Sequence, residues 1–287
     1  MKINLAKSSG FCFGVKRAIE IAAETAKGNK KVFMLGDIVH NEDVSRQVRK
    51  KGIIKTSRLI KGKGRILLIR AHGTSATVIQ KARALGYEIV DATCPMVKEI
   101  HRIAKDMEKK GYRIIIIGDK KHDEVRGITG QLKTPALVID NPKGIPASII
   151  KKLKKIAVVV QSTQNIENVD RIMKPLKKLT GELKFFNTIC RPTTVKQQEI
   201  KKMPSGNDVM IIIGSASSAN TRRLYEISKS QNPRSFWVNS KKEIKLRWFK
   251  DAKMTGVTAG ASTPDWRIRE IVGYLKRLNP QQSLSRR

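Results

Sequence analysis

Aromatic residues, cysteines and long hydrophobic runs are all scarce in this sequence, and each shortage excludes a class of protein. Phe, Trp and Tyr make up 5% of the 287 residues, so a folded core must be packed from Ile, Val, Leu and Ala. No apolar run approaches the roughly 20 residues of a membrane-spanning helix, and the first residues lack the apolar stretch of a secretory signal. With 40% hydrophobic residues, the chain is too apolar to be disordered. We therefore expect a folded cytoplasmic protein that has no membrane partner.

Acidic residues are also few, which leaves the chain strongly basic. Against 59 Lys and Arg there are 24 Asp and Glu, giving a formal net charge of +35. Such a charge favours anionic partners, whether nucleic acids, phosphorylated metabolites or acidic proteins. The lysines are spread over the whole length, however, and no RNA-recognition motif with exposed aromatic residues accompanies them. An RNA-binding protein is the alternative that the charge alone supports, and no specific nucleic acid is expected.

The three cysteines stand in similar surroundings. Their odd number and the absence of a Cys-x-x-Cys pair argue against a disulfide framework and a zinc ribbon. Cys12 and Cys94 are each followed by x-x-Val-Lys, and Cys190 is followed by the same pattern with two extra residues. Each cysteine precedes a pattern that predicts an amphipathic helix, at residues 15–26, 97–110 and 195–203. The cysteines lie 82 and 96 residues apart, which indicates an internal repeat of one small α/β unit.

Two apolar strand patterns follow each cysteine in the same order. The first is a short run that ends in glycine, typical of a parallel strand in a βαβ unit, at residues 32–36, 114–118 and 210–214. The second leads into a polar loop, at residues 66–75, 157–164 and 256–263. We predict an α/β fold of three similar units with mostly parallel sheets in a pseudo-threefold arrangement around a central site. The predicted parts are units 13–93, 94–189 and 190–278, a segment 1–12 that joins the central site, and a tail 279–287.

Polar side chains gather in and beside the loops that follow these strands. Ligands of open α/β sheets bind beyond the carboxyl ends of the strands, so we expect these side chains to meet at one site: His40, His72, His122, Glu124, Ser162, Thr163, Ser218, Asn220 and Ser262. Loops that enter helices present backbone N–H groups to anions, and three histidines indicate an anion with more than one charge, such as a diphosphate. Helix capping is the plainer interpretation of Ser218, Asn220 and Ser262. His101 lies within a predicted helix and has no predicted role.

Three converging thiolates would indicate a metal centre, because soft sulfur ligands select zinc, copper(I) or iron–sulfur clusters. Zinc ligands usually come in close pairs, whereas these cysteines come from separate units and suit a larger group. A 4Fe–4S cluster normally takes four cysteines. With three, one iron stays open to solvent or substrate, as a Lewis-acid site requires. A zinc hydrolase that uses the same Cys and His residues is the second alternative.

The sequence closely resembles the 4-hydroxy-3-methylbut-2-enyl diphosphate reductase family from about Ile3 to about Leu278. The resemblance rests on stretches that occur in order: Gly-Phe-Cys-Phe-Gly-Val at 10–15, Val-His-Asn at 39–41, Ala-His-Gly at 71–73, Asp-Ala-Thr-Cys-Pro at 91–95, His-Asp-Glu-Val-x-Gly at 122–127, Ile-Cys at 189–190, Ser-Ala-Asn-Thr at 218–221 and Gly-Val-Thr-Ala-Gly-Ala-Ser at 256–262. It implies a two-electron reductive dehydroxylation of 4-hydroxy-3-methylbut-2-enyl diphosphate to isopentenyl diphosphate and dimethylallyl diphosphate. This reaction is the last step of the methylerythritol phosphate route to isoprenoids.

The resemblance also implies a role for each site residue. One 4Fe–4S cluster with an open iron would be held by the three cysteines, Cys12, Cys94 and Cys190. The substrate diphosphate would be bound by imidazole, hydroxyl and amide groups: His40, His72, His122, Ser218, Asn220 and Ser262. Glu124 would supply protons at the allylic hydroxyl, with the hydroxyl groups of Ser162 and Thr163 beside it as further substrate contacts. A glutamate desolvated at such a site is expected to have a raised pKa.

The electrons for this reaction would come from outside the chain. The resemblance implies a one-electron donor of the ferredoxin or flavodoxin type, or an NAD(P)H-linked supply. A monomer is expected, because three units can close on one another. Three residues depart from the family's commonest pattern: Asp123 stands where proline is usual, Ser162 where threonine is frequent and Ala219 where a second serine is frequent. Ser162 keeps the hydroxyl group, whereas Ala219 removes one hydrogen bond that a serine would offer to the diphosphate.

Overall fold

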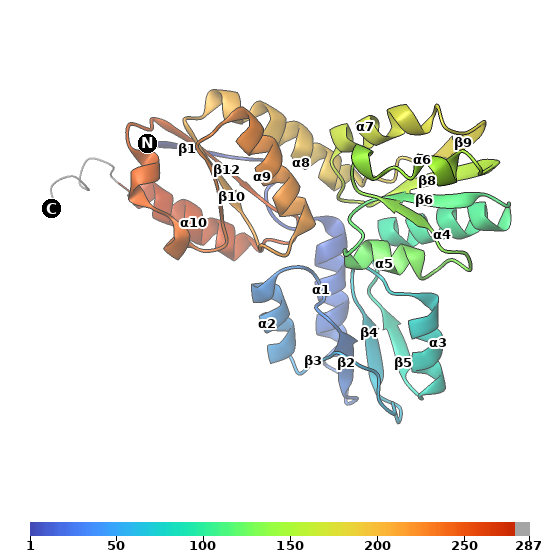
Figure 1. The fold of residues 1–287 in the computed structure, drawn as a ribbon. Helices are drawn as coiled ribbons and strands as arrows, with labels where there is room; N and C mark the ends of the chain where they lie inside the picture. The colour runs from blue at the N-terminus through green and yellow to red at the C-terminus, as the bar shows by residue number, and fades with distance from the viewer. Residues whose placement is uncertain (279–287) are drawn as a thin grey trace. The chain divides into compact units, whose positions relative to one another are not determined.

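The computed structural model describes residues 1–278, and the predicted tail at 279–287 lies outside the described residues. Its strands form three four-stranded sheets, and every pairing in them is parallel (Figure 1). These sheets and their helices confirm the predicted α/β fold of three similar units. Within residues 1–278, each helix is too short or too polar to span a bilayer.

The first two sheets along the chain have the same topology. In the first, the strands stand in the order β3-β2-β4-β5, and in the second in the order β7-β6-β8-β9. The first comprises β2 (Val32–Leu35), β3 (Ile54–Thr56), β4 (Ile66–Ile69) and β5 (Glu88–Asp91), with α1 (Phe13–Thr25), α2 (Glu42–Lys50) and α3 (Ala76–Ala84). The second comprises β6 (Arg113–Ile117), β7 (Leu137–Ile139), β8 (Lys155–Val160) and β9 (Glu182–Phe185), with α4 (Pro95–Lys109), α5 (Asp123–Thr129), α6 (Ala147–Ile150) and α7 (Ile166–Leu176).

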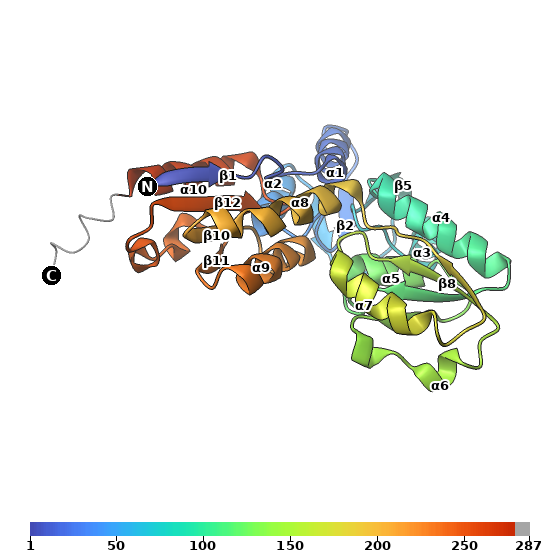
Figure 2. The same ribbon diagram turned by 90° about the horizontal axis from the view of Figure 1, so that it is seen from above.

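The third sheet repeats this topology with a strand borrowed from the N-terminus. It comprises β1 (Lys2–Leu5), β10 (Val209–Ile213), β11 (Ser235–Val238) and β12 (Met254–Ala259), with α8 (Arg191–Lys202), α9 (Ala219–Gln231) and α10 (Asp265–Arg277). The order β11-β10-β12-β1 matches the other two sheets when β1 takes the place of β5 or β9. In Figure 2, β1 lies beside β12 and next to α10. Each cysteine therefore follows the same edge strand of a sheet, and a helix begins at the next residue.

The cores are aliphatic, as the shortage of aromatic residues predicts. In β6, the four isoleucines from Ile114 to Ile117 are fully buried, and in β10 Val209 to Ile213 are buried as well. Burial of each such side chain contributes roughly 1.5–3 kcal/mol. Because consecutive residues of each run are buried, both faces of these strands are covered, which is the usual state of parallel strands.

Contacts within the chain divide it into two compact units. The two-sheet unit contains residues 13–39 and 43–190, with the first two sheets. Of the described residues, the one-sheet unit contains 1–12, 40–42 and 191–278, with the third sheet. The predicted boundaries of the three α/β units stay a prediction.

Candidate functional site

The predicted site residues lie in loops beyond the carboxyl ends of parallel strands or in the first turn of the helix that follows, where open α/β sheets bind ligands. Those in the two-sheet unit are His72, Cys94, His122, Glu124, Ser162, Thr163 and Cys190. Those in the one-sheet unit are Cys12, His40, Ser218, Asn220 and Ser262. All three cysteines are half-buried.

Cys94 lies between β5 and α4, where Pro95 occupies the first helical position and needs no N–H acceptor. The Cys94 backbone N–H donates to the Ala71 carbonyl oxygen at 2.9 Å, which ties the cysteine to the loop that carries His72. The Sγ atom of Cys94 lies against Gly14 of α1: a Cβ atom built at Gly14 would stand 2.5 Å from it. Glycine at position 14 therefore makes the space that the sulfur occupies.

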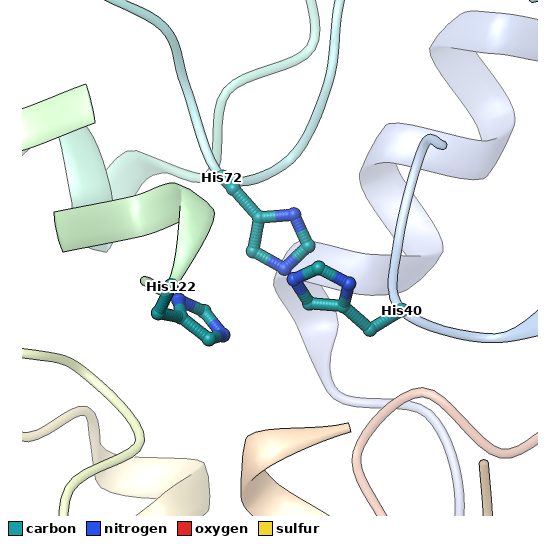
Figure 3. A group of neighbouring side chains, drawn as sticks. All are labelled: His40, His72 and His122. Atoms are coloured by element: carbon teal, nitrogen blue, oxygen red, sulfur yellow. The ribbon is translucent and has the colours of Figure 1, made fainter. Parts of the chain in front are cut away.

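His72 and His122 are neighbours in the two-sheet unit (Figure 3). Their rings are in an edge-to-face arrangement, with ring centroids 5.5 Å apart and ring planes at 88°. His122 caps α5, since its Nδ1 atom accepts a hydrogen bond from the Glu124 N–H at 3.2 Å. A neutral imidazole that accepts at Nδ1 carries its proton on Nε2. His40, the third histidine labelled in Figure 3, belongs to the one-sheet unit.

Glu124 is a buried acid held by one serine. Its side chain is 2% exposed, and its carboxylate accepts two hydrogen bonds from Ser162, from the N–H at 2.6 Å and from the hydroxyl at 2.7 Å. Burial raises the pKa of Glu124 above its ordinary value, and the two hydrogen bonds from Ser162 oppose this rise without cancelling it. The raised pKa confirms the expectation from the sequence. The Ser162 carbonyl oxygen in turn accepts the N–H of Cys190 at 3.1 Å, so one residue contacts both the acid and a predicted cluster ligand.

Thr163 lies next to Ser162 in sequence, yet its hydroxyl has a different partner. The Thr163 Oγ1 atom accepts a hydrogen bond from Nε2 of Gln161 at 3.0 Å, and Oε1 of Gln161 accepts the Asp119 N–H at 2.8 Å. These bonds join the loops that follow β6 and β8. Of the two hydroxyls predicted beside Glu124, Ser162 is the one in contact with the carboxylate, and the role of Thr163 stays a prediction.

Asp123, one of the three departures from the family pattern, forms an ion pair. Its Oδ2 atom lies 2.6 Å from Nη1 of Arg70, and both side chains are four-fifths buried. Arg70 precedes the loop of His72, so the pair joins that loop to the start of α5. The negative charge of Asp123 is therefore compensated, although it is adjacent to Glu124 in the sequence.

His101 is buried beneath the same loop. A Cβ atom at Gly73 would lie 2.9 Å from its Cε1 atom, and one at Gly127 would lie 3.6 Å from its Nε2 atom. Burial lowers the pKa of His101 to about 4, with Lys105 acting in the same direction. The imidazole is therefore neutral near pH 7 and packs against Gly73 of the His72 loop and Gly127 of α5.

In the one-sheet unit, the loops that follow β10 and β12 lie together. The Ser262 hydroxyl donates to the His40 carbonyl oxygen at 3.1 Å and lies 3.4 Å from the Ser218 Oγ atom. Ser218 caps α9, and its Oγ atom accepts the Thr221 N–H at 3.3 Å. The Cys12 N–H donates to the carbonyl oxygen of Ala261 at 3.1 Å, next to Ser262. The capping interpretation of Ser218 is thus correct. The same residue lies at the N-terminus of α9.

Asn220 offers an unused donor in this part of the site. Its side chain is 5% exposed, and among residues 1–278 its Nδ2 atom has no hydrogen-bond partner. A buried polar group without a partner costs about 1–3 kcal/mol. It lies in the first turn of the 13-residue helix α9, whose N-terminus favours anions. An anion bound there would satisfy the Asn220 amide.

Two residues of this region carry no prediction from the sequence. Glu42 accepts hydrogen bonds from Ser215 at 2.7 Å and Ser217 at 3.3 Å, and so holds the loop that leads to Ser218. Its partners lie more than 170 residues away, and no local pattern indicates them. Lys196 on α8 is buried, with a side chain that is 3% exposed. For Lys196 a signal existed, because it is the lysine of the third Val-Lys repeat.

One family of known proteins matches nearly the whole chain: the LytB protein family, over residues 3–276. The chain belongs to the LytB family. This LytB chain is 36% identical over 283 residues to a 4-hydroxy-3-methylbut-2-enyl diphosphate reductase from Geotalea uraniireducens (strain Rf4), covering 99% of this chain and 100% of the relative. A protein of the same name from Aquifex aeolicus (strain VF5) is 35% identical over 287 residues, covering 99% of each.

Solved structures agree with the LytB assignment. The structure of an E-1-hydroxy-2-methyl-but-2-enyl-4-diphosphate reductase from Plasmodium falciparum matches with a TM-score of 0.89 and 29% identity, covering 96% of this chain and 88% of that one. A second structure, described as (E)-4-hydroxy-3-methyl-but-2-enyl diphosphate reductase, the terminal enzyme of the non-mevalonate pathway, matches with a TM-score of 0.70 and 35% identity. It covers 97% of this LytB chain and 100% of that one. The predicted family and fold are thereby confirmed.

Proposed function

We propose that this LytB-family chain is an oxidoreductase that reduces 4-hydroxy-3-methylbut-2-enyl diphosphate to isopentenyl diphosphate and dimethylallyl diphosphate, as the last step of an isoprenoid pathway. The relatives that cover nearly the whole chain carry the name of this reductase. The observation that carries the proposal within the chain is the contact of Ser162 with both Glu124 and Cys190. A proton donor and a soft metal ligand are thereby joined through one residue.

The donor set fits an iron–sulfur cofactor. We propose that one 4Fe–4S cluster is held by the three cysteines, Cys12, Cys94 and Cys190. Each is half-buried and stands immediately before a helix, and the absence of a Cβ atom at Gly14 gives the Cys94 Sγ atom its place. When bound, such a cluster supplies electrons one at a time and, with three protein ligands, a Lewis-acidic position for the substrate hydroxyl.

Imidazole, hydroxyl and amide donors would bind the diphosphate: His40, His72, His122, Ser218, Asn220 and Ser262. The Nε2 proton of His122 and the unpartnered Nδ2 atom of Asn220 support this role, since both are donors. The N-terminus of α9 adds a partial positive charge beside Ser218. An anion with several oxygens can accept from all of these groups.

Glu124 would act as the general acid. Hydroxide is a poor leaving group, and protonation of the allylic oxygen by Glu124 lets water leave in its place. The raised pKa favours the protonated form that a general acid needs. After the proton has gone, the two donors of Ser162 stabilise the carboxylate that remains. Substrate contacts from the hydroxyls of Ser162 and Thr163 belong to the same proposal.

A one-electron donor of the ferredoxin or flavodoxin type, or an NAD(P)H-linked supply, would deliver the electrons. The net charge of +35 supports an acidic protein partner. We further propose that the chain works as a monomer in the cytoplasm, with no specific nucleic-acid partner.

Metal analysis of anaerobically purified protein tests this function directly. We expect about four iron and four sulfide per chain, and turnover of the diphosphate substrate with a chemical one-electron reductant. One zinc per chain without iron would support the zinc-hydrolase alternative instead. Protein that holds the cluster yet fails to reduce the substrate would refute the assigned reaction.

A further inference from the structure

A buried lysine lies in the one-sheet unit beside the segment that leads to Cys12. The Nζ atom of Lys196 donates to the carbonyl oxygen of Ser8, four residues before Cys12, and to that of Ala259 at 3.3 Å. Both acceptors are neutral. Because lysine is rarely buried without a charged partner, the position calls for a physical reason.

The register of α8 explains why this lysine points inward. The helices α1, α4 and α8 each begin at the residue after a cysteine. The repeated lysine is the fourth residue of the first two helices, Lys16 and Lys98, and both are exposed. In α8 the two extra residues make Lys196 the sixth, which turns its side chain by roughly 200° about the helix axis. The lysine of the repeated motif is therefore exposed in α1 and α4 and buried in α8.

Lys196 and Cys12 both donate hydrogen bonds to backbone carbonyl groups at or just beyond the C-terminal end of β12. The Lys196 ammonium binds the carbonyl of Ala259, the last residue of β12, and the Cys12 N–H binds that of Ala261 two residues later. Burial lowers the pKa of Lys196 to about 8, and the nearby carboxylate of Glu199 opposes this change. Glu199 itself accepts hydrogen bonds from Lys7 and Ser8. The ammonium and the predicted cluster ligand are thus held by backbone carbonyl groups two residues apart.

We propose that Lys196 is a positioning residue for the cofactor: its buried positive charge, acting through Cys12, favours the reduced state of the iron–sulfur cluster. The inference rests on the proposed function. An added electron interacts more strongly with a fixed positive charge in a buried site than in water, and reduction potentials of such clusters depend on nearby charge and hydrogen bonding. A weaker reductant could therefore donate the electron to the cluster.

Three variants separate the charge of Lys196 from its hydrogen bonds. Lys196→Met removes both, Lys196→Gln keeps a donor for the carbonyl groups without the charge, and Lys196→Arg keeps the charge. The readout is an anaerobic redox titration of the purified enzyme, followed by visible absorption and electron paramagnetic resonance. Lys202→Met removes an exposed lysine from the same helix and serves as the control.

We expect the reduction equilibrium to shift at least tenfold toward the oxidised cluster in Lys196→Met and Lys196→Gln, which is 59 mV for a one-electron couple. Lys196→Arg and the control are expected to keep the wild-type potential. An unchanged potential in both neutral variants, or a shift in Lys196→Met alone, would overturn the proposal and assign Lys196 to packing.

Loss of the cluster is also informative. Failure of both neutral variants to hold a cluster that Lys196→Arg holds would support a requirement for the charge. Failure of all three would assign the residue to folding and would overturn the proposal. Wild-type protein without iron and sulfide would instead refute the proposed function, so the two failures are distinguishable.

Discussion

Two opposing effects, burial and hydrogen bonds from Ser162, set the pKa of the Glu124 carboxyl group. Burial alone disfavours the carboxylate and raises the pKa, whereas two hydrogen bonds from Ser162 favour it. The net effect is a pKa above the ordinary value, with two donors in place to stabilise the carboxylate when the proton leaves. An exposed glutamate would already be ionised near pH 7.

Replacement of Glu124 by glutamine tests the general acid. The amide has the same shape and still accepts the Ser162 N–H, but it cannot give up a proton. We expect turnover to fall on the order of 10²-fold or more, while cluster absorbance and substrate binding stay near wild type. Steady-state assays with a chemical reductant measure the rate. Near-normal turnover would remove Glu124 from this role.

The raised pKa of Glu124 also sets the direction of the pH dependence. In the proposed reaction the protonated form is the active one, and it is present below the raised pKa and lost as the pH rises through it. We therefore expect kcat to decline on the alkaline side, with no decline on passing through the ordinary glutamate pKa near 4.5. A pH profile of kcat measures this. In Glu124→Gln the alkaline decline caused by this group should vanish, and its persistence would point to another acid.

At the scale of elements, each cysteine occupies the same topological position, after an edge strand and before a helix. The end of each edge strand determines where the chain leaves the sheet. The helix that follows determines the orientation of the cysteine residue before it. Close packing between elements then sets the space for the sulfur, most clearly where α1 meets α4 at Gly14 and Cys94.

Gly14→Ala tests this packing. The added methyl group would lie 2.5 Å from the Cys94 Sγ atom, so either the sulfur or α1 must move. Overpacking of this kind costs roughly 1–3 kcal/mol, and we expect a marked loss of the brown cluster absorbance. Gly28→Ala is the matched control, because a Cβ atom there meets only a carbonyl oxygen at 3.6 Å. Cys94→Ser, which should abolish the intact cluster, gives the reference for complete loss. Full absorbance in Gly14→Ala would contradict the role assigned to this glycine.

The elements that could be predicted are those with local signals. The helices after the cysteines and the strands that end in glycine follow from periodicity, and the loops after them identified Glu124 and Ser218. Strand β1 could not be predicted, because Lys2–Leu5 becomes a strand by pairing with Met254–Val257 at the far end of the sequence. The pair of Asp123 with Arg70 and the bonds of Glu42 to Ser215 and Ser217 likewise depend on tertiary neighbours. Such contacts leave no pattern in the local sequence.

At the scale of the whole molecule, the dominant feature is the excess of positive charge. Many of the acidic residues already form ion pairs with neighbouring Lys or Arg, as Glu88 does with Lys30 and Glu99 with Arg102. Exposed pairs of this kind contribute little to stability. Because 59 Lys and Arg stand against 24 Asp and Glu, a large excess of positive charge remains. Long-range attraction of anions is therefore a property of the surface as a whole, and it acts on rates of encounter.

Salt should reveal this attraction. Raising the ionic strength from about 0.01 M to about 1 M shortens the screening length from roughly 30 Å to roughly 3 Å. We expect kcat/KM for an acidic protein donor to fall on the order of tenfold or more over this range, while the rate with a small uncharged reductant at saturating substrate changes little. Stopped-flow reduction of the cluster at several salt concentrations measures the first quantity. RNA, tested by titration under the same conditions, should bind only at low salt and without sequence preference. Reduction by the protein donor that is indifferent to salt would mean that a local contact, rather than the charge of +35, brings the partner to the enzyme.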